Sequence, residues 1–249
     1  MNGDNSQHLE VLYKELHRLR IGLGGSLRLR DCTETKPWPN AGVYFFFERG
    51  EHRKRSEDPR VVRVGTHAVS KGSKATLWNR LRTHRGTGKG LGNHRASIFR
   101  LHVGAAIAQR DERFLIETWG HGQSADTSTR KQEEELERAV SQHIGAMEIL
   151  WLSIDDPPGP ASDRAYIERH IISLLTVNNG PTDHPSPAWL GHYSPRQQIR
   201  ESGLWNLDFI SHPYDPDALE ILHEYVSATI GTSAKPTTSI APSEWRQRA

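Results

Sequence analysis

Two strand-like runs followed by a helical run, all within residues 41–86, constrain the fold more than any other stretch of the sequence. Residues 43–47 and 61–66 are rich in β-branched and aromatic side chains, and each run is bounded by turn-forming or charged residues. The helical run that follows has apolar residues at helical spacing, and it carries Arg80 and His84 one turn apart on a neighbouring face. The segment therefore predicts a strand, a second strand and a helix that presents a cationic pair.

A second pattern lies further along the chain. An apolar run at residues 149–154 predicts a third strand, and Ser162 is placed to cap a helix that follows it. On that helix Glu168 shares a stripe with Ile171 and other apolar residues. Because burying a carboxylate without a partner is costly, two interpretations stay open: Glu168 holds a divalent metal ion, or it forms a salt bridge with Arg164 or another arginine.

The order of these motifs resembles the GIY-YIG endonuclease superfamily. The matching positions, in chain order, are Gly42, Val43, Tyr44, Arg63, Val64, Gly65, Arg80, Glu168 and Asn179, with Asn178 as the alternative to the last. Arg63 stands where the superfamily has the tyrosine that opens its second motif. The spacing of Arg80 and His84 further resembles the branch found among restriction endonucleases. The resemblance spans residues 41–180, and its specificity comes from the order of the short motifs.

The resemblance implies a fold, a reaction and a set of site residues. The fold is α+β, a small three-stranded antiparallel sheet flanked by helices, with helical insertions and a helical C-terminal extension. The reaction is hydrolysis of phosphodiester bonds in DNA, with Mg²⁺ or Mn²⁺ held by Glu168. The residues expected to be catalytic are Tyr44, Arg63, Arg80, His84, Glu168 and Asn179.

Roles for these residues follow from the same resemblance. Tyr44 is expected to act at the attacking water, and Arg80 to neutralise charge that develops on the phosphoryl oxygens. An unperturbed phenol has a pKa of about 10, so Tyr44 needs a nearby cation or metal, and Arg63 is placed to supply one. His84, with an ordinary pKa of about 6.5, is a second candidate for proton transfer or phosphate contact.

The charge of the chain is unevenly distributed. The net charge is only +2, but residues 49–113 contain 16 Lys or Arg against 5 Asp or Glu, a local net charge of +11. Clustered cations beside a catalytic motif favour a nucleic-acid backbone as partner, although a solvated charged surface is the simpler alternative. The residues predicted to bind nucleic acid are Arg53, Lys54, Arg55, Lys71, Lys74, Arg82, Arg85, Lys89, His94 and Arg95.

The organisation of the chain is predicted from its patterns of helices and turns. The predicted parts are an N-terminal helical extension (1–40), the core (41–180) with an insertion at about 97–146, a C-terminal helical extension (181–231) and a disordered tail (232–249). Ser97 is placed to cap a helix within the insertion. Ser194 is placed to cap a short helix in the C-terminal extension, with Pro195 at its first position, Gln197 completing a capping box and Gly203 at its end.

The sequence also gives expectations about the location of the protein in the cell and about alternative functions. A single cysteine excludes an internal disulfide, and no apolar run reaches the ~20 residues that a membrane span needs. The N-terminal residues show no hydrophobic signal segment. A cytoplasmic protein is therefore expected. A restriction role predicts a homodimer on a palindromic site. The alternative function is a non-catalytic DNA-binding module on the same scaffold. No nucleotide-binding, hydrolase-elbow or zinc motif supports an unrelated chemistry.

Overall fold

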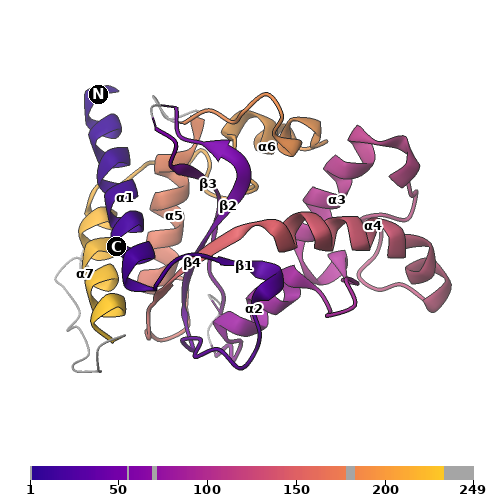
Figure 1. Ribbon diagram of the computed structural model, residues 1–249, viewed down its shortest axis with the longest axis horizontal. Coiled ribbons are helices and arrows are strands. Elements are labelled where there is room, and N and C mark those ends of the chain that lie inside the picture. The colour runs from indigo at the N-terminus through magenta and orange to yellow at the C-terminus, as the bar shows by residue number, and fades with distance from the viewer. Residues whose placement is uncertain (1, 55, 69–71, 178–182, 233–249) are drawn as a thin grey trace.

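The computed structural model describes residues 2–54, 56–68, 72–177 and 183–232 (Figure 1). In chain order the elements are α1 (Asn2–Gly22), β1 (Leu27–Arg28), η1 (Leu29–Asp31), β2 (Gly42–His52), β3 (Pro59–Gly65), α2 (Leu77–Arg85), η2 (His94–Ala96), α3 (Ile98–Arg110), η3 (Glu112–Phe114), α4 (Thr127–Ala146), β4 (Glu148–Ser153), α5 (Asp163–Leu175), η5 (Leu190–Tyr193), α6 (Gln197–Ser202) and α7 (Asp217–Thr232). The predictions for Arg55, Lys71 and Asn179, and for residues 233–249, lie outside the described residues.

The strands form one four-stranded antiparallel sheet in the order β1-β4-β2-β3. The α+β class and the three longer strands agree with the sequence, but the prediction of three strands was incomplete. The fourth strand, β1, consists of Leu27 and Arg28 alone, which pair with Ile149 and Glu148. A strand of two residues is too short to show the alternating pattern that reveals a strand in a sequence.

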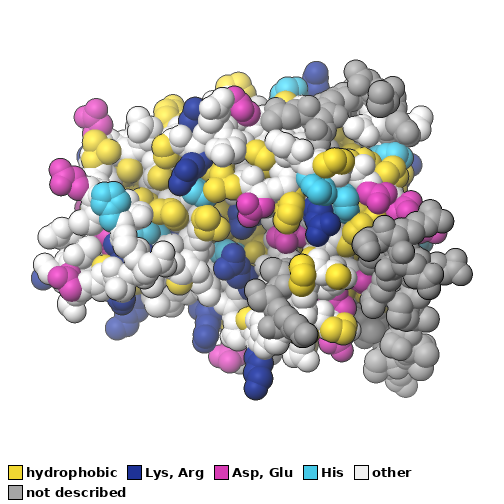
Figure 2. Space-filling model, turned by 180° about the vertical axis from the view of Figure 1, so that it is seen from behind, with side chains coloured by type: hydrophobic (Ala, Val, Ile, Leu, Met, Phe, Trp, Pro, Cys, Tyr) yellow, Lys and Arg dark blue, Asp and Glu magenta, His cyan; other side chains and the backbone are white. Residues whose placement is uncertain are grey.

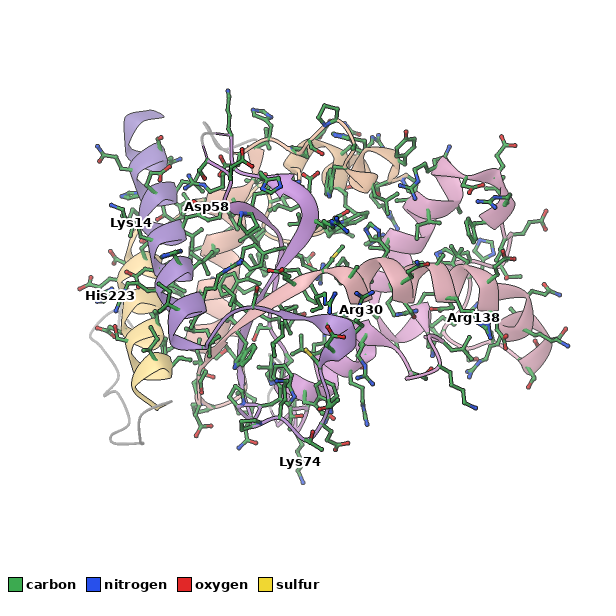
Figure 3. All side chains as sticks on the ribbon, in the orientation of Figure 1. Lys14, Arg30, Asp58, Lys74, Arg138 and His223 are labelled. Carbon is green, nitrogen blue, oxygen red and sulfur yellow. The ribbon has the colours of Figure 1, made fainter. Side chains whose placement is uncertain are left out.

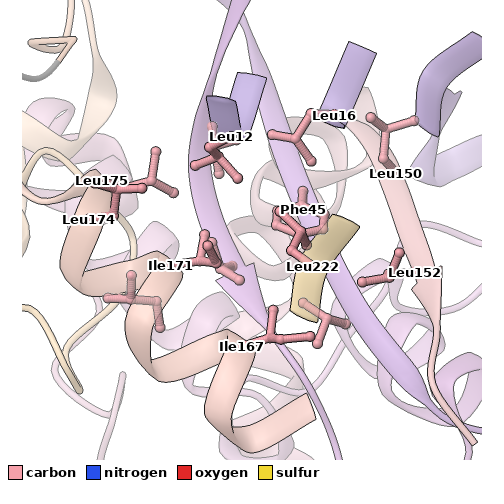
Figure 4. Packing of buried hydrophobic residues seen from close by; sticks show 14 of the residues in the cluster. Leu12, Leu16, Phe45, Leu150, Leu152, Ile167, Ile171, Leu174, Leu175 and Leu222 are labelled. Atoms are coloured by element: carbon pink, nitrogen blue, oxygen red, sulfur yellow. The ribbon is translucent and has the colours of Figure 1, made fainter. Parts of the chain in front are cut away.

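The two faces of β2 belong to two different hydrophobic cores, because successive side chains on a strand point in opposite directions. Val43, Phe45 and Phe47 pack with α1, α5 and α7, and Figure 4 shows leucines of α1 and isoleucines of α5 around Phe45. Tyr44 and Phe46 face the other way and pack with α2, α3 and α4. The sheet therefore lies between two groups of helices, which Figure 1 shows on either side of it.

Several predicted helix boundaries can be compared with the structure. The helix predicted after Ser97 is α3, and Ser97 Oγ accepts a hydrogen bond from the Arg100 amide at 3.3 Å. The predicted capping box of α6 is wrong: the helix begins at Gln197, and Ser194 Oγ instead accepts from the Arg196 amide at 3.2 Å in the turn before it. The predicted end of α6 is confirmed, because Gly203 adopts the left-handed conformation that terminates it. Within the described residues, every helix is too short or too polar to span a bilayer.

Candidate active site

The two glycines of the motifs lie where there is no room for a side chain. A Cβ atom at Gly42 would lie 2.0 Å from the carbonyl oxygen of Leu152 on β4. A Cβ atom at Gly65 would lie 2.3 Å from Oη of Tyr44, the residue with which it pairs across β2 and β3. Glycine at position 65 therefore allows the Tyr44 ring to lie across the end of β3.

The Tyr44 hydroxyl is the start of a buried chain of hydrogen bonds. Tyr44 Oη lies 2.9 Å from His84 Nε2, and His84 Nδ1 lies 2.8 Å from Ser97 Oγ. Tyr44 and His84 are fully buried and Ser97 is 1% exposed. Burial lowers the pKa of His84 well below 6.5, and the positive charges of Arg80, Arg63 and Arg100 lower it further, so the imidazole is neutral.

Arg63, at the altered position of the second motif, connects this hydrogen-bonded chain to a pocket. It lines the pocket described below, interacts electrostatically with Tyr44 and donates from Nη1 to the carbonyl oxygen of Trp205 at 2.6 Å. Its guanidinium also lies 4.7 Å from the centre of the Phe99 ring. Burial lowers the pKa of Arg63, an effect that the charges of Tyr44 and Glu168 oppose. The cation therefore lies between the phenol and the pocket.

A pocket of about 310 Å³ brings Arg63, Arg80 and Glu168 together. A second cavity of about 380 Å³ shares Thr66 and Arg80 with it, so Arg80 lies where the two meet. The Nε atoms of Arg63 and Arg80 are buried and have no hydrogen-bond partner among the described residues. Larger hollows of about 750 and 700 Å³ lie along α1 and along β2, respectively. None of the predicted catalytic residues that the structure describes lines them.

Glu168 projects from α5, a helix capped by Ser162 as predicted. Its Oε1 accepts a hydrogen bond from the Thr66 amide at 3.0 Å, at the end of β3. Burial raises the pKa of Glu168 to about 7, and the cations Arg63 and Arg80 oppose this rise. The proposed salt bridge to Arg164 is wrong, because the Arg164 side chain forms an ion pair with Asp156 at 3.3 Å.

The carboxylates of this pocket fit a magnesium ion better than a zinc ion. No group of three or more His, Cys, Asp or Glu side chains is arranged to hold a metal within the part of the chain that the structure describes. Mg²⁺ at phosphoryl-transfer sites is commonly held by one or two carboxylates, with substrate phosphates and water as the other ligands. Glu168 has no salt-bridge partner among the described residues, and the exposed carboxylate of Asp208 lines the same pocket.

Four of the cations predicted to bind nucleic acid are exposed. They are Lys54, Lys74, Arg82 and Lys89. Three of these lie on or beside α2, the helix that carries Arg80, and Figure 3 shows Lys74 extending away from the fold. These residues remain available to a phosphate backbone.

The other described members of that set have partners inside the protein. Arg53 forms ion pairs with Glu10 at 2.5 Å and Asp183 at 2.9 Å, and Arg95 pairs with Glu133 at 2.6 Å. His94 Nδ1 lies 3.0 Å from the Glu137 carboxylate, and the ring stacks on Trp119. Arg85 donates to the carbonyl oxygen of Cys32. Acidic residues from outside the basic block thus neutralise part of its charge. On the face shown in Figure 2, the lysines and arginines do not form one continuous patch.

Sequence reasoning missed several residues of the site. Thr66 supplies the amide that holds Glu168, and Ser97 bonds to His84. His102 and the segment 205–209 line the pocket with Arg63 and Glu168. The role of Ser97 as a helix cap was predicted from the sequence. Its contact with His84 was not, because that contact depends on the packing of α3 against α2. The other contacts join segments far apart in the sequence and leave no local pattern.

Comparison with known proteins identifies one related group. The chain matches a family model described as GIY-YIG domain over residues 3–232. The match includes every residue that lines the pocket. No curated protein and no solved structure matches the chain.

Proposed function

Because the chain belongs to the GIY-YIG domain family, and that family implies nuclease activity on DNA, we propose that it is a metal-dependent endonuclease that hydrolyses phosphodiester bonds. One observation carries the proposal. Arg63, Arg80 and Glu168 line a single pocket, and Tyr44 and His84 form a buried hydrogen bond behind Arg63. Two cations and one carboxylate in a pocket beside a proton-accepting pair are what phosphoryl transfer requires.

The two arginines bind and stabilise the scissile phosphate. Both line the pocket, and the Nε atom of each lacks a hydrogen-bond partner among the described residues. Arg63 is already held in place by its hydrogen bond to Trp205 and its contact with Phe99. Fixed donors of this kind stabilise the negative charge of a transition state without reorganising during the reaction.

Tyr44 and His84 remove the proton of the attacking water. As the water oxygen bonds to phosphorus, the water proton passes to the Tyr44 oxygen and the Tyr44 proton passes to Nε2 of His84. Because Tyr44 is buried behind Arg63, this step requires Arg63 to make room for the water when DNA binds. The neutral state of His84 leaves Nε2 able to accept that proton when Nδ1–H donates to Ser97 Oγ. The positive charge of Arg63 lies beside the phenol, with which it interacts electrostatically.

Glu168 is the residue that would hold the divalent cation, Mg²⁺ or Mn²⁺. When bound, such an ion polarises the phosphate and stabilises the leaving oxygen. The Thr66 amide fixes one carboxylate oxygen of Glu168 towards the end of β3. Asn179 is assigned to the catalytic site only because its position resembles the asparagine of the superfamily motif.

Lys74, Arg82 and Lys89 are the residues we assign to the DNA backbone, together with Lys54 on the loop between β2 and β3. Their exposure, and the position of the first three on or next to α2, the helix that carries Arg80, support this assignment. The resemblance to restriction enzymes supports a role in restriction or defence in the cytoplasm. A homodimer is the form expected on a palindromic site.

A non-catalytic DNA-binding module is the second candidate. Arg63 in place of the motif tyrosine, and the full burial of Tyr44, are the observations that favour it. The experiment that separates the two is cleavage of plasmid and phage DNA with Mg²⁺ or Mn²⁺ by the wild type and by Glu168→Ala. Glu220→Ala, which alters an exposed glutamate on α7, is the matched control.

The nuclease proposal expects nicked or linear products from the wild type and the control, and none from Glu168→Ala. Retained, salt-sensitive DNA binding without cleavage by the pure wild type would instead support the binding module. Cleavage by Glu168→Ala at the wild-type rate would remove Glu168 from the mechanism.

A further inference from the structure

We propose that the pocket beside Glu168 contains a second subsite, which holds one unstacked nucleobase next to the scissile phosphate. The inference rests on the proposed nuclease function and specifies its substrate: DNA with an unpaired or extruded nucleotide at the cut. The subsite is formed by Ile98, His102, Leu207 and Phe209, all of which line the pocket that also contains Arg63.

The pocket is lined by both charged and apolar side chains. Arg63, Arg80 and Glu168 are among the charged ones, and Ile98, Leu207 and Phe209 are among the apolar ones. Only six large hydrophobic side chains are exposed among the described residues, and two of them, Ile98 at 49% and Phe209 at 36%, belong to this pocket. Exposed apolar groups beside a charged site indicate a ligand that carries both chemistries.

His102 supplies an unsatisfied polar atom in the same pocket. The side chain is 2% exposed, and its Nε2 is buried without a hydrogen-bond partner among the described residues. Buried polar atoms are nearly always paired in folded proteins, so an unpaired one that lines a pocket is available to pair with a ligand atom. A neutral imidazole nitrogen can pair with a polar atom on the edge of a base.

Phe209 is held in an unusual conformation. Its φ of 66° lies in the left-handed region, which bulky residues rarely adopt. The segment before it is fixed to β3, because the Trp205 amide donates to Val62 O at 2.8 Å and the Asn206 side chain bonds to both the amide and the carbonyl of Val64. The Arg169 guanidinium lies 5.7 Å from the centre of the Phe209 ring. Strain of this kind persists where the surrounding structure enforces it, and it is concentrated at functional sites.

These features select a nucleobase over other ligands. The two arginines suit a phosphate, and the exposed aromatic ring of Phe209 in the same pocket suits a flat aromatic group. A cavity of about 310 Å³ is small and accepts one base rather than a stacked pair. A base in an intact duplex is stacked and paired, so a base that is already unpaired enters this subsite at lower cost.

The test measures DNA binding by the full-length protein without divalent metal, so that no cleavage occurs. Two duplexes of equal length carry aminopurine, a fluorescent base, either fully paired or as a single unpaired nucleotide. The wild type is expected to bind the unpaired form at least ~10-fold more tightly and to change its fluorescence. Phe209→Ala is expected to lose roughly 5- to 150-fold of that affinity, the range found when a stacking aromatic is removed.

Tyr193→Ala, which removes an aromatic side chain that is 44% exposed outside the pocket, is the matched control. Ile98→Ala and His102→Gln provide further variants if Phe209→Ala fails to fold, and each is expected to reduce the preference for the unpaired duplex. Equal affinity for the two duplexes, or a loss in Phe209→Ala no larger than that in Tyr193→Ala, would overturn the proposal.

The failure of this inference can be distinguished from failure of the proposed function. Cleavage of intact plasmid with no preference for the unpaired duplex would keep the nuclease and reject the subsite. Phe209-dependent binding of the unpaired duplex without any cleavage in Mg²⁺ or Mn²⁺ would keep the subsite and reject the nuclease. Absence of DNA binding by the folded protein would reject both.

Discussion

Ser97→Ala tests whether His84 is positioned by its contact with α3. Ser97 Oγ makes two hydrogen bonds, one with His84 Nδ1 at 2.8 Å and one that caps α3 by accepting from the Arg100 amide at 3.3 Å. The substitution removes both, and it leaves Nδ1 of a fully buried histidine without a partner.

The expected cost follows from these two contacts. Loss of a serine N-cap destabilises a protein by about 1 kcal/mol. A buried polar atom left unsatisfied costs about 1–3 kcal/mol. The free energy of unfolding should therefore fall by roughly 2–4 kcal/mol, which for a chain of this length lowers Tm by roughly 5–15 °C. Because His84 is then free to change its ring orientation or its tautomer, DNA cleavage should also fall by roughly 10- to 100-fold.

Urea denaturation and single-turnover cleavage of plasmid DNA measure the two effects separately. Asp126→Ala is the matched control, because it removes the N-cap of α4 in the same way, at a position remote from His84. Ser97→Thr keeps a hydroxyl and should recover most of the activity. If Ser97→Ala cleaves DNA at the wild-type rate, the contact with Nδ1 has no part in the reaction.

Three further substitutions or conditions give distinct results. Gly65→Ala places a methyl group against the Tyr44 hydroxyl. It should lower the free energy of unfolding by about 1–3 kcal/mol in urea titration and abolish cleavage in a plasmid assay. Wild-type activity would contradict the close approach of Tyr44 to residue 65. Burial lowers the pKa of both His67 and His102 to about 4, so the unfolded chain, with a pKa of 6.5, takes up their protons first on acidification. Lowering the pH from 6.5 to 5 should therefore reduce the free energy of unfolding by roughly 1.5 kcal/mol per histidine. A variant with both histidines replaced by Gln should show a flatter pH dependence in thermal melts. Glu137→Gln breaks a buried ion pair with an arginine of α3 and should cost about 3 kcal/mol in urea titration, whereas Glu134→Gln, at an exposed pair, should cost little.

The fold was predictable from the sequence where the signal was local. The β-branched and aromatic residues of β2, the helical spacing in α2 and the cap of α5 are each local features of the sequence. The three long strands and the helices that carry Arg80 and Glu168 could therefore be placed in advance. The two-residue strand β1 could not be predicted, because it is defined only by its pairing with β4 in the folded structure.

The site was less predictable, because the fate of a charged residue depends on partners far along the chain. The sequence predicts that Arg53 and Arg95 bind phosphate. In the structure Arg53 forms an ion pair with Asp183, and Arg95 forms one with Glu133, and both carboxylates come from distant segments of the chain. Positive charge counted along the sequence therefore overestimates the positive charge left on the surface.

The attachment of residues 205 and 206 to β3 has a consequence for assembly. β3 is at one end of the sheet, and its backbone would otherwise offer unpaired groups along that edge. Trp205 pairs with Val62 and Asn206 with both backbone groups of Val64, so part of this edge is already satisfied. A second copy of the chain thus cannot extend the sheet through β3 without displacing the segment that carries Phe209. Association through that edge would compete directly with the pocket, so a dimer that retains an intact pocket must use a different surface.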